Sequence, residues 1–186
     1  MQQDLAQTDE ETWEAIRHES MDELAQEIGR MCLYWSELEM EVTLALDALM
    51  NINDRVPRNI LLGAMDFRTK LQVLLPVAFN CKINDHWYSE LETVINIING
   101  ELRNERNRII HDSWFEFPAR DNSHKTHRVR LYGKVVNKQS RTKELQLADY
   151  RPFGPKDVGL LYVRMIRARG RLSRLMHEWK ANQISD

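Results

Sequence analysis

The chain has 186 residues, which fits one domain, and its content of 42% hydrophobic and 29% charged residues excludes global disorder. No apolar run approaches the roughly 18 residues of a membrane span, and the acidic, polar start lacks the basic and apolar regions of a signal peptide. Cys32 and Cys81 lie outside any CxxC spacing, which argues against a disulfide framework or a zinc site. We therefore expect a soluble, cytoplasmic protein that needs no cofactor and no membrane.

Charge is distributed unevenly along the chain. Residues 1–50 contain thirteen acidic and two basic residues, whereas residues 51–186 contain 15 acidic and 24 basic ones. Such a polarity can hold two chains together, and the basic part can attract a polyanion. Decoration of solvent-exposed helix faces explains the same distribution equally well.

Three helices are predicted in the first 118 residues, after a mobile arm or short helix over 1–20. Each is indicated by apolar residues that recur every three or four positions and share one face. The apolar stripes run over residues 24–49, 60–78 and 91–109. Stretches that contain Asn, Asp or Pro separate the helices, and Pro118 ends the third.

A different pattern follows the third helix. Apolar and polar residues alternate in two short stretches with a polar stretch between them, which predicts a β-hairpin over about 128–148. A last helix is predicted over 156–181. The expected fold class is therefore mainly all-α: a helical bundle with core helices over 21–117, a hairpin insertion and a C-terminal helix, in a single domain that spans 1–186.

The most informative segment lies near the end of the third predicted helix. It contains Arg106-Asn107 followed by His111, an RNxxxH spacing, with an aliphatic pair before the histidine and Trp114 three residues after it. Other Arg/His pairs in this chain have a similar spacing, so the spacing alone is a weak signal. Arg106 differs from them because it lies on a strongly periodic helix that follows two long amphipathic ones.

Over about residues 21–115 the chain resembles the HEPN superfamily, whose signature is an Arg four to six residues before a His near a helix end. The residue after that Arg is typically Asn, Asp or His, which Asn107 matches. A Trp-x-x-Leu-Glu stretch at 35–39 and a Phe-x-x-Lys stretch at 67–70 also resemble this family.

The resemblance implies a helical homodimer in which two such helices meet and share one composite cleft. It also implies an endoribonuclease that acts as a toxin or in antiviral defence. A cognate antitoxin or another subunit of a defence system would be a further partner.

The residues suit metal-independent cleavage of RNA. An imidazole has an unperturbed pKa of about 6.5 and can accept and donate protons near neutrality, so His111 would remove the proton of a ribose 2′-OH. The 2′-oxygen then attacks the adjacent phosphate, and Arg106 would stabilise the anionic transition state. Asn107 would orient His111 or bind the phosphate. This mechanism predicts a 2′,3′-cyclic phosphate end.

Helical geometry constrains this interpretation. At about 100° per residue, Arg106 lies roughly 60° from the apolar stripe and roughly 140° from His111. A guanidinium beside buried surface needs a partner, which would be an acidic residue, a second chain or a phosphate. In the structural alternative, Arg106 pairs with Glu37, Glu39 or Glu41, and His111 only interacts with the helix C-terminus. The chain would then be a non-catalytic interaction module such as an antitoxin, a scaffold or an accessory subunit.

Basic residues elsewhere predict a surface for RNA. They lie on the third helix, the hairpin and the last helix: Arg103, Arg108, Arg128, Arg130, Lys134, Arg164, Arg167 and Arg171. The arginines of the last helix recur every three or four residues, which suits phosphates or docking on the acidic first fifty residues. An RNA-binding domain without cleavage is therefore a third hypothesis. His124 and His127 form an HxxH spacing that no further ligand completes, so no metal site is predicted.

Overall fold

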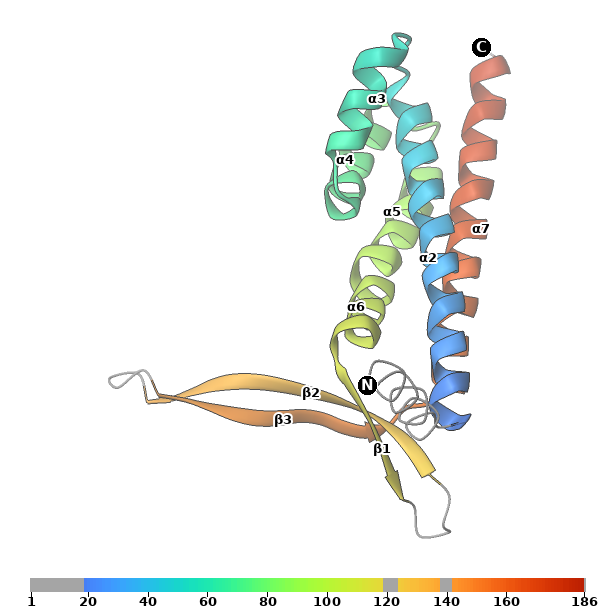
Figure 1. Cartoon of the computed structure of the whole chain (residues 1–186). Coiled ribbons are helices and arrows are strands. Elements are labelled where there is room, and N and C mark those ends of the chain that lie inside the picture. The colour runs from blue at the N-terminus through green and yellow to red at the C-terminus, as the bar shows by residue number, and fades with distance from the viewer. Residues whose placement is uncertain (1–18, 119–123, 138–141, 186) are drawn as a thin grey trace, which may run out of the picture. The chain divides into compact units, whose positions relative to one another are not determined.

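The computed structural model describes residues 19–118, 124–137 and 142–185. It is mostly helical, with one three-stranded antiparallel sheet (Figure 1). The mainly helical fold class predicted from the sequence is therefore confirmed. Most of the expected N-terminal arm, residues 1–18, lies outside the described residues.

The chain divides into two compact units. The first, which we call the helical unit, comprises Arg30–Arg108 and the described residues from Gly159 onward. The second, which we call the sheet unit, comprises Ile109–Val158 and the described residues up to Gly29. The single domain over 1–186 stays a prediction.

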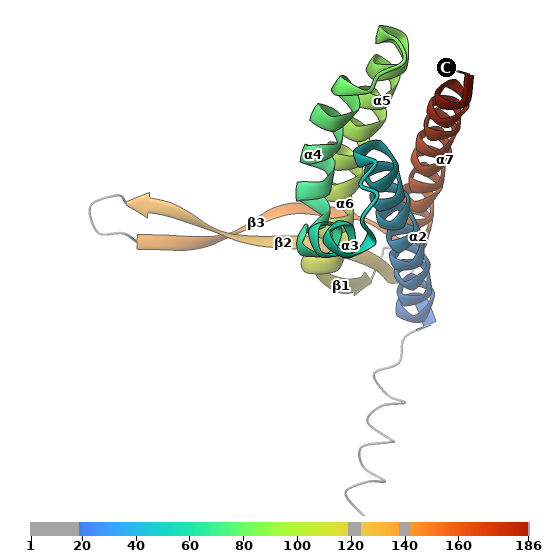
Figure 2. The ribbon, with the colours of Figure 1, turned by 90° about the horizontal axis from the view of Figure 1, so that it is seen from above.

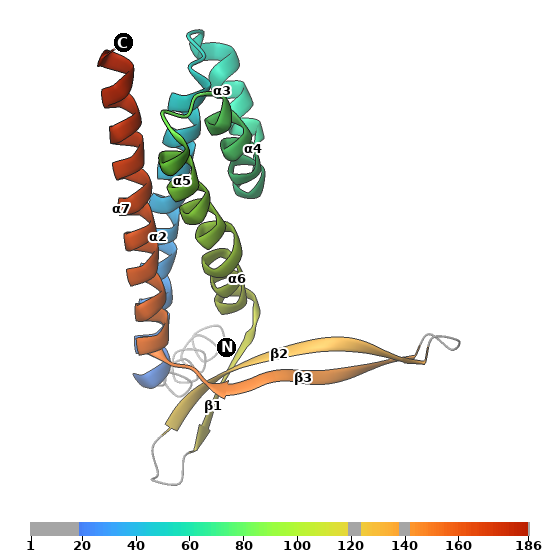
Figure 3. The same ribbon diagram turned by 180° about the vertical axis from the view of Figure 1, so that it is seen from behind.

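The helical unit is built from seven helical segments, three of which continue into the sheet unit. They are α2 (Glu19–Met50), α3 (Arg55–Ala64), α4 (Phe67–Asn80), α5 (Asp85–Ile97), the π-helical segment η1 (Ile98–Leu102), α6 (Arg103–His111) and α7 (Pro155–Ser185). Within this unit α2 and α7 lie side by side (Figures 1 and 3), and Tyr34 stacks on Tyr162 with ring centroids 5.1 Å apart. Figure 2 shows α4 beside α5, where Phe79 meets Tyr88 edge-on.

The first and third predicted stripes and the α4 part of the second contribute to the core of the helical unit. Buried members of the first stripe include Met31, Leu38 and Val42, and those of the third include Leu91 and Ile98. Burial of each such side chain contributes about 1.5–3 kcal/mol.

Two indole N–H groups also attach α7 to its neighbours. Trp87 donates to the carbonyl of Leu175 at 2.9 Å, and Trp179 donates to the carbonyl of Cys81 at 2.9 Å. Each indole ring is therefore buried while its N–H keeps a hydrogen-bond acceptor.

The second predicted helix is in fact two helices. The chain breaks at Met65, which has an extended backbone, and Asp66 then caps α4 by accepting a hydrogen bond from the amide of Thr69 at 2.7 Å. Asp54 and Asn84 cap α3 and α5 in the same way. The α4 part of the predicted stripe, Leu71, Leu74 and Ala78, is buried, whereas Ile60 and Ala64 on α3 are exposed, so the stripe predicted for the α3 part is wrong.

The third predicted helix ends earlier than expected. It consists of α5, η1 and α6 and stops at His111, and the strand β1 (Ser113–Pro118) follows where a helix up to Pro118 was predicted. Trp114 donates its indole N–H to the carbonyl of Ile109 at 3.0 Å, which satisfies an acceptor at the helix end. The sequence Ser-Trp-Phe-Glu-Phe has strong strand formers that outweigh the helical pattern before it.

The sheet unit contains a three-stranded sheet in the order β1-β2-β3. The predicted hairpin is confirmed, but its strands β2 (His124–Asn137) and β3 (Thr142–Pro152) are longer than predicted. β1 pairs with the start of β2, from Pro118 opposite His124 to Ser113 opposite Val129. Figures 1 and 3 show β2 and β3 as a long twisted ribbon.

None of the described helices combines the length and the apolar character that crossing a membrane requires. The longest, α2 and α7, carry exposed polar residues between their buried apolar ones, together with a few exposed apolar side chains such as Leu33 and Leu160.

Candidate functional site

Arg106 lies in the middle of α6 and rests on an aromatic ring. Its guanidinium carbon is 5.7 Å from the centroid of the Trp35 ring, within the range of a cation–π contact. Its Nη1 donates a hydrogen bond to Oδ1 of Asn107 at 3.2 Å. The half-buried guanidinium is therefore held by a ring and by the amide of the next residue.

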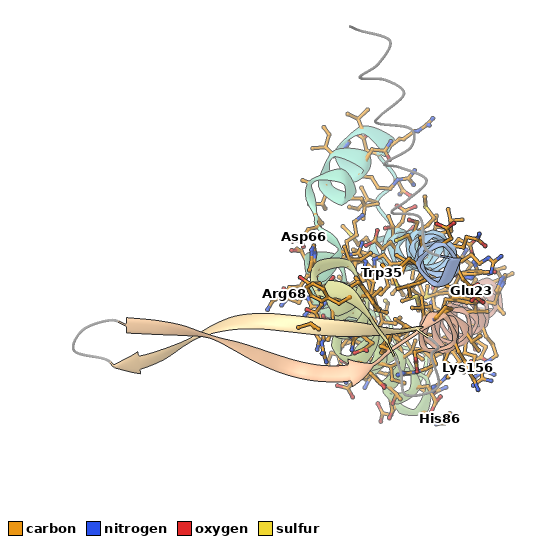
Figure 4. The ribbon with its side chains drawn as sticks, turned by 60° about the horizontal axis from the view of Figure 1, so that its bottom comes forward. Glu23, Trp35, Asp66, Arg68, His86 and Lys156 are labelled. Atoms are coloured by element: carbon orange, nitrogen blue, oxygen red, sulfur yellow. The ribbon has the colours of Figure 1, made fainter. Side chains whose placement is uncertain are left out.

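The residues that hold Arg106 come from the two stretches noted in the sequence. Trp35 is 4% exposed, donates its indole N–H to Oε1 of Glu39 at 2.6 Å, and meets the Phe67 ring edge-on at 5.0 Å (Figure 4). Lys70 donates to Oγ1 of Thr43 at 3.1 Å, which further links α4 to α2. The Trp-x-x-Leu-Glu and Phe-x-x-Lys stretches thus form one support for Arg106.

This arrangement differs from the pairing of Arg106 with Glu37, Glu39 or Glu41 that the structural alternative predicted. Glu39 accepts the hydrogen bond of Trp35, and Glu37 forms an ion pair with Arg169. Among the described residues, the partners of Arg106 are Trp35 and Asn107 rather than a carboxylate. A ring stabilises the guanidinium without neutralising it, so its charge remains available for an anion.

His111 is the last residue of α6, and its side chain is exposed. The residue after it is anchored in the sheet unit. Oδ2 of Asp112 lies 3.7 Å from Nε of Arg128, which is fully buried and lies 4.1 Å over the Phe153 ring. Phe153 also contacts Trp114, with ring centroids 5.7 Å apart. This cluster fixes the chain on the C-terminal side of His111.

The burial of Arg128 corrects one prediction. Arg128 was expected to bind RNA on the hairpin, but its side chain is inaccessible to solvent. It faces the interior of the sheet unit because the carboxylate of Asp112 and the ring of Phe153 compensate its charge there.

The other predicted RNA-binding residues have varied surroundings. Arg103 and Arg108 are half-buried on α6, and the side chains of Arg130 and Lys134 lie outside the described residues. On α7, Arg164 forms an ion pair with Glu101, and Arg171 forms one with Glu90 at 3.0 Å. Arg167 between them is exposed.

Three of the arginines on α7, Arg164, Arg167 and Arg171, border a small cavity. Its volume is about 190 Å³, and Val94, Ile97 and Ala168 form its apolar lining. Two of the three arginine charges are already compensated by carboxylates. The predicted phosphate-binding stripe of α7 is therefore less cationic than its sequence indicates.

Asp66 adds an acidic group at the start of α4. Hydrogen bonds from Thr69 lower the pKa of Asp66, and the charges of Arg68 and Arg103 lower it further. Figure 4 shows Asp66 and Arg68 at this end of the helix. The described residues contain no group of three or more His, Cys, Asp or Glu side chains placed to hold a metal ion. The side chains of the HxxH pair lie outside the described residues.

Arg106, Asn107 and His111 stay predicted site residues, and the sequence did not indicate the side chains that surround them. The contact of Trp35 with Arg106 was indicated only by the Trp-x-x-Leu-Glu stretch. The Asp112–Arg128 pair had no signal in the sequence because its members are sixteen positions apart. Comparisons with models of protein families, with curated proteins and with solved structures find no match for this chain. The functional assignment therefore depends on the residues described above.

Proposed function

We propose that this chain is a metal-independent endoribonuclease with a HEPN-like helical fold, active as a homodimer. The observation that supports this most is the arrangement of α6. It presents a guanidinium held by a ring and an amide, and it ends five residues later in an exposed imidazole. A fixed cation and a titratable base are the two groups that cleavage of RNA by its own 2′-OH requires.

In the proposed reaction His111 takes the proton of a ribose 2′-OH. The 2′-oxygen forms a bond to the adjacent phosphorus, and the bond from phosphorus to the 5′-oxygen breaks. A second imidazole, from the other copy, gives its proton to the leaving 5′-oxygen. The products are a 2′,3′-cyclic phosphate and a 5′-OH, and DNA is not a substrate because it lacks the attacking hydroxyl.

Arg106 would bind the phosphate oxygens as negative charge accumulates on them. A guanidinium already held against Trp35 loses little conformational freedom when it binds, so more of its interaction stabilises the transition state. Asn107 bonds Arg106 in the structure, so we assign it to the orientation of Arg106 rather than of His111. This changes the role that the sequence suggested for Asn107.

An Arg/His ribonuclease of this kind fits a toxin or an antiviral effector. Cleavage of cellular RNA arrests growth, so such a chain needs restraint by a cognate antitoxin or by another subunit of a defence system. This biological role follows from the resemblance to the HEPN superfamily.

The proposal is tested with purified wild type, Arg106→Lys and His111→Asn, incubated with total RNA in the presence of EDTA. We expect cleavage by the wild type and a loss of about 100-fold or more in each variant, the size expected when a transition-state donor or a general base is removed. Arg174→Lys and His86→Asn are matched controls because both residues are exposed and lie on other helices. Analysis of the fragment ends must find the cyclic phosphate.

The same experiment separates the alternatives. RNA binding that weakens with salt, without cleavage, would support an RNA-binding domain instead. Neither binding nor cleavage, together with a stable second protein in a pull-down, would support a non-catalytic interaction module. Cleavage that EDTA abolishes would contradict the proposed mechanism.

A further inference from the structure

The arginines of the helical unit differ in whether a carboxylate compensates their charge. Four arginines of α7 and one of α3 form ion pairs with described carboxylates: Arg164, Arg169, Arg171, Arg174 and Arg58. Arg68 on α4 and Arg103 and Arg106 on α6 have no carboxylate within ion-pair distance in the part of the chain that the structure describes. We call these three residues the arginine cluster. Their charges are available to an anion from outside the chain.

One set of contacts connects the members of the arginine cluster. Arg106 lies over the Trp35 ring, and the ring of Phe67, the first residue of α4, meets Trp35 with centroids 5.0 Å apart. Arg68 directly follows Phe67 in the chain. Arg103 lies three residues before Arg106, a spacing at which side chains are neighbours on a helix surface. The start of α4 therefore lies beside the part of α6 that carries both arginines.

Asp66 is the acidic residue next to the cluster, at the start of α4 with Arg68 (Figure 4). Its Oδ1 accepts the hydrogen bond of the Thr69 amide that caps the helix. The charges of Arg68 and Arg103 both lower the pKa of Asp66, which places both guanidiniums near its carboxylate, although neither is within ion-pair distance. Two guanidiniums thus share one carboxylate, and a positive charge remains there in addition to that of Arg106.

The guanidinium of Arg103 is packed at its base and open at its end. Arg103 is half-buried, and its Nε is covered by protein without an acceptor among the described residues. Its two terminal nitrogens are neither covered in this way nor hydrogen-bonded within the described chain, so a ligand can reach them. A packed side chain loses little conformational freedom when it binds an anion. Arg68 is exposed and can approach the same anion.

We propose that Arg68 and Arg103 bind the RNA phosphate next to the one that is cleaved, so that the strand passes from Arg106 to the start of α4. The inference rests on the ribonuclease function proposed above and adds a requirement for substrate length. A guanidinium binds the oxygens of one phosphate, so unpaired guanidiniums on two helices suit a chain of phosphates better than a single small anion. A trinucleotide, which has two phosphates between its nucleosides, is then the shortest RNA that uses the whole cluster.

The test measures the affinity of the full chain for a labelled RNA of about ten nucleotides, in EDTA and over a range of salt concentrations. All proteins carry His111→Asn, so that the RNA is not cleaved. Arg68→Gln and Arg103→Gln each remove one charge of the cluster. Asp66→Asn removes the neighbouring negative charge and keeps a residue that caps helices well.

Arg55→Gln is the matched control. Arg55 is exposed and has no carboxylate partner in the described chain, like Arg68, but it lies at the start of α3. Thermal unfolding of each variant checks that it folds.

We expect Arg68→Gln and Arg103→Gln each to weaken RNA binding by about 3- to 10-fold. Each should also reduce the slope of log affinity against log salt by about 0.7, the value for one phosphate contact with a single strand. Asp66→Asn should strengthen RNA binding by about twofold, because a negative charge near the phosphate is removed. Arg55→Gln should change neither the affinity nor the slope.

Three outcomes would overturn the proposal. They are cluster variants that bind RNA like Arg55→Gln, a parent that does not bind RNA, and an Arg103→Gln protein whose affinity falls for inorganic phosphate but not for RNA. The last outcome would make the cluster a site for a small anion.

Failure of this inference differs from failure of the proposed function. A wild type that cleaves RNA, with cluster variants that bind like Arg55→Gln, would overturn only the second phosphate site. A wild type that binds RNA with the expected differences between variants but does not cleave it would contradict the ribonuclease function and still support the site.

Discussion

Arg106 lies on the ring of Trp35, and the indole of Trp35 is in turn bonded to Glu39. The carboxylate thus fixes the ring rather than the guanidinium, so the positive charge of Arg106 is positioned without being neutralised. A direct Arg106–Glu39 ion pair would have satisfied burial equally well but would have left no charge for a phosphate.

The first prediction concerns this platform. Trp35→Phe should lower RNA cleavage by about two- to fivefold, because the smaller ring loses its hydrogen bond to Glu39 and weakens a cation–π contact of about 0.5–1 kcal/mol. Trp179→Phe is the control, since it also removes a buried indole hydrogen bond but lies far along the sequence from α6. The measurements are the initial cleavage rate and the free energy of unfolding in urea for both variants. Equal losses of cleavage rate in Trp35→Phe and Trp179→Phe would show that Trp35 acts only through the stability of the fold.

A second prediction contrasts the two arginines that lie over aromatic rings. Asp112→Ala should lower the free energy of unfolding by about 3–5 kcal/mol, because it removes the carboxylate beside the fully buried Arg128. Arg106→Ala should cost less than about 1 kcal/mol, because Arg106 is only half-buried and its contact with Trp35 is a cation–π contact rather than an ion pair. Urea denaturation measures both values. The double variant Asp112→Leu/Arg128→Met should recover much of the loss, and a further decrease would contradict the pairing.

A third prediction follows from the lowered pKa of Asp66. A carboxyl whose pKa is lower in the folded chain stabilises the fold above its unfolded pKa, about 3.9, and this contribution disappears as the pH falls through the folded-state pKa. The difference in unfolding free energy between wild type and Asp66→Asn should therefore be constant from about pH 7 to 5 and shrink below about pH 4. Urea titrations at each pH measure it. In a Thr69→Val background, the change with pH in this difference of unfolding free energy should be smaller. A difference between wild type and Asp66→Asn that grows as the pH falls would show that the pKa of Asp66 is not lowered in the folded chain.

The fourth prediction concerns the thiol of Cys81. Burial raises its pKa, and its Sγ also donates to the carbonyl of Val77 at 3.2 Å. Because the thiolate is the reactive form, Cys81 should be alkylated by iodoacetamide more slowly at pH 8 than the thiol of glutathione. The measurement uses a Cys32→Ser background, so that one thiol reacts. Trp179→Phe removes the hydrogen bond to the carbonyl of Cys81 and should speed the alkylation of Cys81. If Cys81 in the Cys32→Ser protein reacts as fast as glutathione, burial does not raise its pKa.

Helical periodicity predicted most of the core because burial of one helix face leaves a regular pattern in the sequence. The prediction was wrong on α3, where Ile60 is exposed, and at two element boundaries where a local preference opposed the helical pattern. The break at Met65–Asp66 has no proline or glycine, and only the capping aspartate marks it. The strand β1 follows α6 almost directly, and pairing with β2, which begins six positions after β1 ends, decides its structure.

For the candidate site, the sequence named the groups with reactive chemistry but not the groups that hold them. The RNxxxH spacing is local, so it could be read directly. Phe67 reaches Trp35, and Trp35 reaches Arg106, only after α2, α4 and α6 have packed. Asp112 meets Arg128 only after β1 has paired with β2. Contacts of this kind depend on tertiary structure and have no fixed spacing.

Asp112 joins the last residue of α6 to the sheet, since it is covalently bound to His111 and held by Arg128 on β2. The β2–β3 ribbon extends well past the part of β2 that pairs with β1. The imidazole therefore projects from a segment whose next residue is tethered to the sheet, which limits how far the backbone at position 111 can shift.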